Sequence, residues 1–476
     1  MAESLSGTAT TTVLTLPELL TRVLEHLDAP TLARAVRVNR QWFACGTDVL
    51  WREPPVANLL ALGSESRQQI YAPKIRKLDF TPLDNCDGNQ LHSSLKHLSF
   101  RSLRIVSIDM YRLAKGCSYD ILQYIQPRLE ELVIFGGELD DDLLRHIRAT
   151  CPRLRRILLD APGKAVTPLG FYDFIVGCRA LEKMEFLYGM DHLLTDRLLS
   201  HLASRETLTR LGLGRPLSKD FLEHISDNVP QPFAALKSLQ LRQPISSSAV
   251  PWLSRELSHL RTLDFAVRDA DASILPYISS MSKLRSLTLI LATPSELSSQ
   301  EIMSLGALSR LAKLFIGPDG QGGESGPRVT EQGSFDSVFD ELCSKLASLK
   351  VLEFNVQCDL SAQALRSLSN HCPLLEELKL PQAIDIRELN LEAVDEAMFP
   401  NLIHLGLDGL FGPVVENVPA AEHICAKKTA ELLRKHCPRL ADLCLSTSDD
   451  THEQVLDAFE GLDTCTCPDY SLTMSL

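Results

Sequence analysis

Apolar residues recur along this chain in a short alternating pattern, L-x-x-L-x-L, with other large apolar residues allowed at the leucine positions. The pattern begins at fourteen positions, which are Ile75, Leu95, Leu129, Leu154, Leu181, Leu208, Leu236, Leu260, Leu284, Leu311, Leu349, Leu375, Leu402 and Leu440. Most intervals between successive starts are 24–28 residues, and the exceptions are 20, 34 and, twice, 38 residues. Because such alternation is typical of a strand with one buried face, we predict fourteen regularly spaced β-strands.

Amphipathic helical stretches lie between these matches, for example at 141–154, 195–208 and 361–375. In the first of them, Leu143, Leu144 and Ile147 fall on one helical face. A strand and a helix every ~25 residues make up the leucine-rich repeat, whose units stack around a shared core. We therefore predict an α/β leucine-rich-repeat solenoid, a horseshoe with parallel strands on its concave side. It should span 75–445, with insertions at 317–333 and 408–423.

Several repeats carry a cysteine where the helix is expected to end. The segments HCPLLEELKL at 371–380, HCPRLADLCL at 436–445 and CPRLRRILL at 151–159 resemble the cysteine-containing subclass of leucine-rich repeats. The segment GCRALEKMEF at 177–186 keeps the cysteine but has Arg179 where proline is usual. This resemblance implies that a small buried cysteine ends each of these helices.

The stretch at 14–55 precedes the repeats and has a different pattern. Thr15 and Glu18 fit a capping box around Pro17, and apolar residues then follow at helical spacing as far as Leu27. A module of this size buries little core, and surplus apolar side chains usually mark a partner surface. The same stretch would also fit an N-terminal cap for the solenoid, so both interpretations stay open.

The stretch also resembles the F-box in the type and order of its residues. The matching positions are Leu16, Pro17, Glu18, Leu19, Leu20, Val23, Leu24, Leu27, Asp28, Leu32, Ala35, Val38, Trp42, Leu50 and Trp51. It departs from that pattern at Asn39, where Cys or Ser is commoner, and at Phe43, where a polar residue is usual. An F-box followed by leucine-rich repeats resembles the F-box/leucine-rich-repeat proteins that are common in fungi.

This resemblance implies a substrate receptor of an SCF-type ubiquitin ligase. The F-box would dock on the SCF adaptor subunit, and through it on cullin, while the repeats hold an unknown target protein. Such a chain raises the effective concentration of its target and needs no cofactor and no catalysis of its own. The residues expected to bind the adaptor are Leu16, Pro17, Leu19, Leu20, Val23, Leu24, Leu27, Leu32, Val38, Trp42 and Trp51.

The predicted organisation has five parts. They are a disordered N-terminus at 1–13, the F-box at 14–55, a linker helix at 56–74, the repeats at 75–445 and a C-terminal cap or tail at 446–476. The main alternative is a ligase-independent scaffold whose N-terminal helices only cap the solenoid.

One set of strand residues is a candidate for target binding. On the expected concave face, the third pattern positions of three adjacent repeats are Glu131, Arg156 and Lys183. The fifth positions of the same repeats are Val133, Leu158 and Glu185. Apolar residues gather there where polar ones are expected, and such anchors ringed by charge are typical of a hot spot. They could instead pack under an adjacent loop. The set comprises Val133, Phe135, Leu158, Leu187 and Tyr188.

A second, weaker candidate for target binding is Phe315 with Val351, beside the insertion at 317–333. The glycine and polar content of that insertion predicts disorder.

Charge and composition narrow the function further. The chain has 48 basic and 61 acidic residues, a net charge of -13, which disfavours nucleic acid as a partner. No window approaches the ~20 apolar residues of a membrane span, so no membrane partner is expected. Thirteen scattered cysteines indicate reduced thiols, typical of the cytoplasm or nucleus.

Several segments match the beginning of a catalytic or metal-binding motif, but each lacks a residue that the motif requires. HEQVL at 452–456 lacks the second histidine of a zinc protease, and no phosphate-binding G-K-[ST] follows the glycines of 317–333. Cys465 and Cys467 lack zinc-finger spacing. We therefore expect no enzyme and no bound metal. A third possibility is a GTPase activator supplying Arg156 or Arg210, which nothing distinguishes from ordinary strand arginines.

Overall fold

The computed structural model describes residues 16–81, 88–111, 118–269, 273–291, 295–318, 326–331, 333–391, 395–412, 426–446 and 450–461. The chain divides into two compact units, Met1–Arg215 and Pro216–Leu476. The predicted disordered segment at 1–13 lies outside the described residues, as do Thr15, Cys465 and Cys467.

Three helices form the N-terminal part of the first unit: α2 (Pro17–Leu24), α3 (Ala29–Ala35) and α4 (Arg40–Leu50). Helix α2 starts after Leu16, which makes no side-chain cap bond. Asp28 caps α3 by accepting the Thr31 backbone N–H at 3.1 Å. Asn39 caps α4, because its Oδ1 accepts the backbone N–H groups of two first-turn residues at 2.9 Å. The Asn39 departure from the F-box pattern therefore has a structural role.

The core of this helical module is small. Leu20 and Leu24 of α2 and Leu32 of α3 pack with Cys45 of α4. Gly46 lets α4 approach closely, because a Cβ there would lie 2.5 Å from the Cγ1 atom of a neighbouring valine. The predicted helical faces of this module therefore converge on one cluster.

The segment between these helices and the first strand was predicted as one linker helix. It forms α5 (Val56–Leu60), α6 (Glu65–Tyr71) and the 3-10 turn η1 (Ala72–Lys74). The break falls at Gly63, whose φ of 63° is left-handed. A hydrogen bond of 3.1 Å from the Gln68 side chain to the Leu59 carbonyl ties the two helices together.

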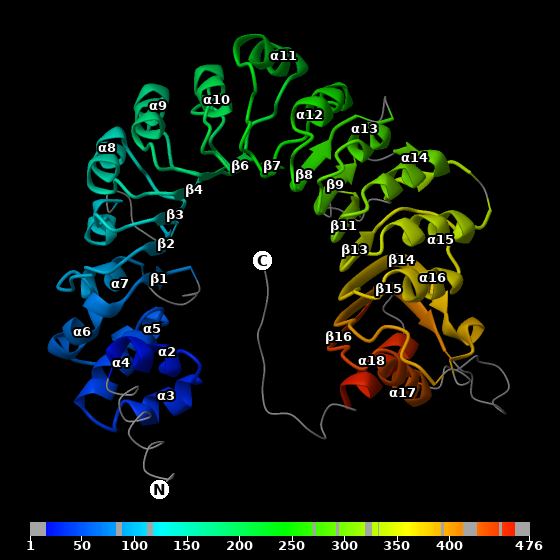
Figure 1. The fold of residues 1–476 in the computed structure, drawn as a ribbon, viewed down its shortest axis with the longest axis horizontal. Coiled ribbons are helices and arrows are strands. Elements are labelled where there is room, and N and C mark those ends of the chain that lie inside the picture. Colours follow the sequence, from blue (N-terminus) through cyan, green and yellow to red (C-terminus); the bar gives the residue numbers. More distant parts are fainter. Residues whose placement is uncertain are drawn as a thin grey trace, which may run out of the picture. The chain divides into compact units, whose positions relative to one another are not determined.

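Strand–helix repeats make up the rest of the first unit, and Figure 1 shows the helices on one side of the strands. The strands pair in parallel in sequence order. They are β1 (Lys77–Asp79), β2 (Ile105–Asp109), β3 (Glu131–Phe135), β4 (Arg156–Asp160), β5 (Lys183–Phe186) and β6 (Arg210–Leu213). The helical elements between them are α7 (Gly88–Ser94), η2 (Ser118–Tyr124), α8 (Asp141–Thr150), α9 (Pro168–Gly177) and α10 (Asp196–Ala203).

The second unit continues the same repeat pattern. Its main strands are β7 (Ser238–Leu241), β8 (Thr262–Val267), β9 (Ser286–Leu291), β11 (Lys313–Gly317), β13 (Val351–Phe354), β14 (Glu377–Asp385), β15 (His404–Phe411) and β16 (Asp442–Leu445). The longer helices are α11 (Lys219–Asn228), α12 (Val250–Glu256), α15 (Asp336–Lys345), α16 (Gln363–His371), α17 (Ala426–His436) and α18 (Asp450–Gly461). Shorter elements are α13 (Leu275–Ser279), α14 (Ser299–Ser304), η3 (Ser247–Ala249), η4 (Leu305–Ala307) and η5 (Ile386–Leu389). Stacked parallel strands with a helix between successive strands confirm the predicted leucine-rich-repeat fold.

One predicted strand was misplaced. The match beginning at Leu95 forms no strand, and the second strand is instead β2, preceded by Leu103. Leu103, Val106 and Ile108 are fully buried, as the pattern requires. Moving the start from Leu95 to Leu103 changes the first two intervals to 28 and 26 residues. The repeat is therefore more regular than the first assignment suggested.

The two insertions also contain regular structure. Within the first, β12 (Arg328–Val329) pairs in parallel with β10 (Glu296–Leu297), so this part is ordered against expectation. Residues 319–325 and 332 lie outside the described residues. The second insertion begins inside β15, whose last residues pair with the end of β14. Residues 413–425 lie outside the described residues.

The helix-end cysteines are buried free thiols. Cys151, Cys178, Cys372 and Cys437 directly follow α8, α9, α16 and α17. Burial raises the pKa of the Cys151 thiol to about 12 and that of Cys178 to about 11. The Cys151 and Cys178 thiols therefore stay protonated at neutral pH and pack as small groups in the core.

Candidate protein-binding surfaces

The exposed face of α2 is apolar. Leu16, Leu19 and Val23 are spaced three and four residues apart and retain 47%, 40% and 45% of their accessible surface. Leu20 and Leu24 lie on the opposite, buried face. Helix α2 is therefore apolar both toward its own core and toward solvent, which marks a partner surface.

Two further large apolar side chains are exposed in the same module. Val38, just before α4, is 62% exposed, and Phe43 of α4 is 42% exposed. Sequence reasoning included Val38 but treated Phe43 only as a departure from the F-box pattern. Its position next to Trp42 gave no decisive signal, because adjacent helical residues can share a buried face, as Leu143 and Leu144 do in α8.

The other residues that were predicted to bind the adaptor differ in how far they are exposed to solvent. Leu20, Leu24 and Leu32 are buried in the core, where no partner can reach them, and they hold the helices together. Leu27 and Trp42 are half-buried against that core, and Pro17 is exposed. Trp51 stacks on Tyr71 of α6, with ring centroids 4.4 Å apart.

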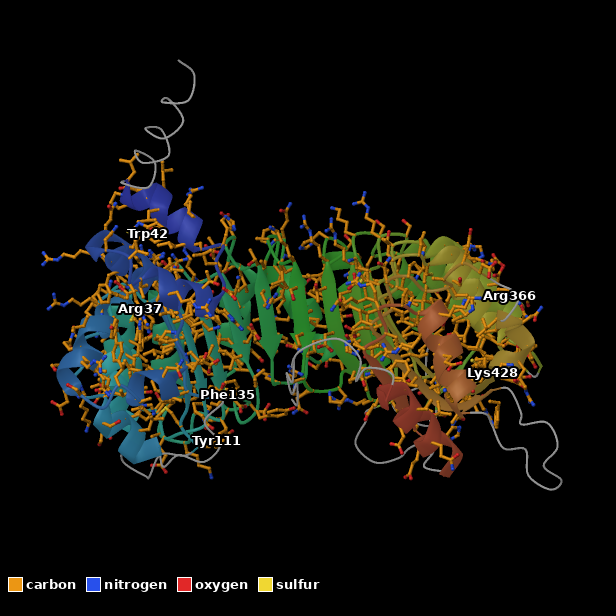
Figure 2. All side chains as sticks on the ribbon, turned by 90° about the horizontal axis from the view of Figure 1, so that it is seen from below. Arg37, Trp42, Tyr111, Phe135, Arg366 and Lys428 are labelled. Carbon is orange, nitrogen blue, oxygen red and sulfur yellow. The ribbon has the colours of Figure 1, made fainter. Side chains whose placement is uncertain are left out.

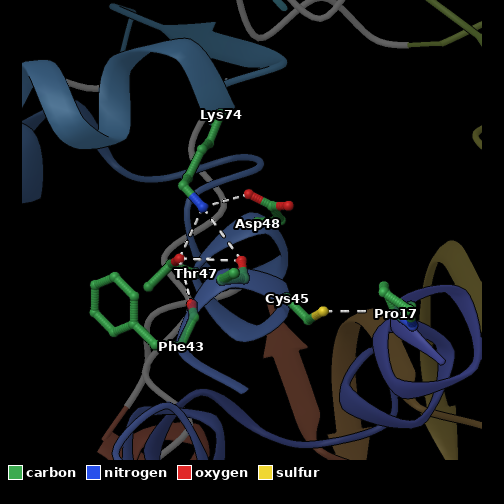
Figure 3. Close-up of polar contacts among 7 residues, drawn as sticks. Pro17, Phe43, Cys45, Thr47, Asp48 and Lys74 are labelled. Carbon is green, nitrogen blue, oxygen red and sulfur yellow. Dashed lines mark hydrogen bonds and ion pairs between the residues drawn. The ribbon is translucent and has the colours of Figure 1, made fainter. Parts of the chain in front are cut away.

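The helical module is joined to the repeats by a polar network, which Figure 3 shows. The Lys74 ammonium donates to the Asp48 carboxylate at 2.5 Å, to the Thr47 hydroxyl at 2.9 Å and to the Ala44 carbonyl at 3.2 Å. On the far side of α4, the Cys45 thiol lies 3.8 Å from the Pro17 carbonyl. Helix α4 thus links the start of α2 to the segment that leads into the sheet.

Backbone hydrogen bonds extend the sheet pattern into this junction. The N–H groups of Arg76 and Lys77 donate to the Arg52 carbonyl at 2.8 and 3.1 Å. The next repeat does the same, with Arg104 and Ile105 donating to the Arg76 carbonyl at 2.8 and 3.0 Å. Arg52 therefore takes the place of a preceding repeat, and its side chain pairs at 2.6 Å with a glutamate just after α2.

Ion pairs cross the sheet in the first unit. Arg156 lies between Glu131 and Glu185, at 3.3 and 3.2 Å from their carboxylates. This pairing occupies the arginine considered for a GTPase-activating role. The strand register also places Val133 beside Leu158, and each retains only 7% of its surface. These two candidate target-binding residues can offer little contact area.

The remaining candidates lie near the carboxyl ends of the strands. Phe135 ends β3 and is half-buried, Leu187 follows β5 and is half-buried, and Tyr188 is 59% exposed. The structure adds Tyr111, which follows β2, is 61% exposed and donates from its hydroxyl to Asp160 at 3.1 Å. Sequence reasoning missed Tyr111 because the strand before it had been placed at Leu95.

Asp160 organises these residues. It is the last residue of β4, pairs in register with Phe135 and is nearly buried. One carboxylate oxygen accepts the Tyr111 hydroxyl, and the other accepts the Tyr188 backbone N–H at 3.0 Å. Partial burial and then this hydrogen bond raise the pKa of Tyr111, which keeps its hydroxyl protonated and donating. We call Tyr111, Phe135, Asp160 and Tyr188 the aromatic edge.

In the second unit, Phe315 and Val351 are both half-buried strand residues. The register pairs Phe315 with Glu353, and Val351 with Lys313. The two apolar side chains are therefore diagonal neighbours, each opposite a charged residue.

The described residues were also compared with the requirements of a metal site and of a membrane span. Within the described parts of the chain, no three His, Cys, Asp or Glu side chains gather closely enough to hold a metal ion. Among the described helices, none combines the length and apolar character needed to cross a bilayer. His452, from the incomplete zinc-protease motif, is nearly buried, and its Nε2 accepts the Leu410 backbone N–H at 3.1 Å.

Comparison with protein-family models places one match on the helical module, at residues 17–54, and the matching family is described as F-box-like. The chain carries an F-box-like domain. A comparison with curated protein sequences found no match. Among solved structures, the chain is similar to one described as the complex of Rad7 and Elc1 in yeast. That similarity has 13% sequence identity and a TM-score of 0.48, and it covers 95% of this chain and 97% of the other.

The boundaries of the F-box-like domain agree with the contacts described above. The matched residues include α2, α3 and α4 and end just after Arg52, whose carbonyl starts the backbone pattern of the sheet. The exposed side chains of Leu19, Val23, Val38 and Phe43 all belong to it.

Proposed function

We propose that this chain is a substrate-recognition subunit of an SCF-type ubiquitin ligase. In this proposal, the F-box-like domain docks on the SCF adaptor subunit, and through it on cullin. The leucine-rich repeats bind a target protein. The chain itself makes or breaks no bond and acts by holding the target near the ubiquitin-loading subunits.

The observation that carries this proposal is the exposed apolar set of the F-box-like domain. Leu16, Leu19, Val23, Val38 and Phe43 present apolar surface, while the buried Leu20, Leu24 and Leu32 position their helices. A domain that only capped the solenoid would turn its apolar side chains toward the repeats and leave a polar outer face.

The capping role is nevertheless present in the same domain. The Arg52 carbonyl and the Lys74 network join it to the first repeat. Removing residues 16–55 would therefore damage the repeats whether or not the domain binds an adaptor. A deletion cannot separate the ligase receptor from the ligase-independent scaffold, and point substitutions on the exposed face are needed.

The test is co-purification of the full chain with the SCF adaptor, comparing wild type with the double variant Leu16→Asp/Leu19→Asp. Aspartate is a favourable N-cap residue and complements the helix dipole in the first turn, so both changes support α2 while placing charge on its apolar face. The matched control is Leu169→Asp, because Leu169 is an exposed leucine in the first turn of α9.

Capture by the wild type and by Leu169→Asp, with loss in the folded double variant, is the expected result. Failure of all three folded chains to capture the adaptor would favour the ligase-independent scaffold. Equal capture by all three would mean that another surface binds the adaptor. Circular dichroism and thermal unfolding of each chain check the fold.

A further inference from the structure

Two residues of the aromatic edge, Tyr111 and Tyr188, are exposed, and hydrogen bonds hold the Tyr111 side chain and the Tyr188 backbone in place. The side chain of Tyr111 is fixed through its hydroxyl at Asp160, and its backbone N–H donates to Asp109 at 3.0 Å. The backbone of Tyr188 is fixed by Asp160, and its carbonyl accepts the Ala161 N–H at 2.8 Å. The Tyr111 ring is thus ordered before a partner binds, so it should lose little conformational entropy when a partner covers it.

A glycine supports the position of the Tyr111 ring. Gly136 has a φ of 71°, and a Cβ built there would lie 2.5 Å from the Tyr111 ring. The ring therefore lies directly over the backbone that follows β3, at a distance that no side chain at this position would allow. Figure 2 shows Tyr111 and Phe135 close together at one edge of the first unit.

The two ends of these strands differ in how their charges are paired, because the amino-end Arg156 is paired with Glu131 and Glu185. Arg156, Lys183 and Arg210 occupy aligned positions at the amino ends of β4, β5 and β6. Asp109 and Asp160 occupy aligned positions, on either side of Phe135, at the carboxyl ends of β2 and β4. The aromatic edge therefore lies at the acidic ends of the strands.

We infer that the aromatic edge binds a positively charged side chain, arginine or lysine, in a segment of the target protein. Aromatic faces attract cations, and the nearly buried carboxylate of Asp160 adds charge attraction with little screening by water. The chain's net charge of -13 favours the approach of a basic segment. Describing that segment as a target rests on the proposed function, whereas the binding chemistry does not.

The two binding surfaces do not compete for space. In Figure 2, Tyr111 and Phe135 lie toward one edge of the first unit, and Trp42 of the F-box-like domain lies toward the other. A segment bound at the aromatic edge would thus leave the exposed face of the domain accessible to the adaptor.

The probe for this inference is a random dodecapeptide library displayed on phage and selected against the full chain. Enriched sequences are then synthesised with a fluorescent label, and their binding is measured by anisotropy. We expect them to share an arginine or lysine. Binding should weaken at least about tenfold for Tyr111→Ala and for Tyr188→Ala. The matched control is Tyr277→Ala, since Tyr277 is an exposed tyrosine of α13 in the other unit.

Two further measurements separate the contribution of the aromatic ring from that of the peptide's positive charge. Tyr188→Phe keeps the ring and should retain binding, whereas replacing the peptide's arginine or lysine with glutamine should weaken it at least about tenfold. The inference is overturned if no peptide is enriched, if enriched peptides lack a basic residue, or if Tyr277→Ala weakens binding as much as Tyr188→Ala. Adaptor capture by the same variants tests the proposed function separately, because an intact F-box-like domain should capture the adaptor whatever happens to the peptide.

Discussion

Replacing either of two adjacent leucines of α2 by alanine should affect a different property: the stability of the domain at Leu20 and its affinity for the adaptor at Leu19. Leu20 is fully buried in the core of the F-box-like domain, whereas Leu19 retains 40% of its surface. Truncating a fully buried leucine to alanine removes about 2–5 kcal/mol of unfolding free energy, so Leu20→Ala should destabilise the domain by that amount. Leu19→Ala should change the unfolding free energy by less than about 1 kcal/mol.

The effect on adaptor binding follows from the surface that Leu19 still exposes. Complete burial of a leucine contributes about 1.5–3 kcal/mol, so burying the remaining 40% can contribute only about 0.6–1.2 kcal/mol. Leu19→Ala should therefore weaken adaptor binding about three- to eightfold. Leu20→Ala should weaken it only by the fraction of the domain that is unfolded.

Hydrogen exchange of the backbone amides in α2, α3 and α4 measures the stability of the domain, and calorimetric titration with the adaptor measures its affinity. The reasoning is refuted if Leu19→Ala speeds exchange as much as Leu20→Ala does. It is also refuted if the loss of affinity in Leu19→Ala follows its loss of stability, because Leu19 would then belong to the core and not to the binding face.

Three further predictions concern the repeats. Burial lowers the pKa of His92 below its usual 6.5, so the unfolded chain binds that proton more tightly. The stability of the wild type should therefore decrease as the pH falls below 6.5, and urea titrations at several pH values should show a smaller decrease for His92→Gln. A Cβ at Gly214 would lie 1.7 Å from the Leu187 carbonyl oxygen, so Gly214→Ala should lower the melting temperature strongly. In the matched change Gly212→Ala, the new Cβ would lie 3.4 Å from the Cα of Glu185, an ordinary van der Waals distance, so this change should have little effect. His452→Ala leaves a buried backbone N–H of β15 without this acceptor and should cost about 1–3 kcal/mol in a denaturant titration.

Periodicity predicted the repeat fold well because each repeat buries its large apolar residues in one shared core. The misplaced second strand shows where that signal fails. Leu95, Leu98 and Phe100 satisfy the strand pattern and are all buried, but they follow the short helix α7 without forming a strand. An apolar pattern reports burial, and only the spacing to neighbouring repeats identifies the strand.

The candidate sites were predicted less completely for a physical reason. Resemblance to a family identified the helical stretch but could not separate its inward from its outward leucines, because both faces of α2 are apolar. At the aromatic edge, the sequence contained Phe135 and Tyr188 but gave no reason to join them to Tyr111. That association depends on Asp160, whose two carboxylate oxygens connect residues 49 and 28 positions away along the chain.

The junction explains how docking and capping can coexist in one small domain. The inner side of α4 and the Arg52 carbonyl face the first repeat, while the exposed residues of α2 and Phe43 remain available to a partner. Because Arg52 repeats the backbone bonding that joins one repeat to the next, the F-box-like domain is attached as if it were a repeat and not through a flexible linker. A bound adaptor would then hold the nearest repeats in a fixed direction. A target segment at the aromatic edge, which lies at the ends of β2 to β5, would consequently be presented at a defined position relative to the adaptor.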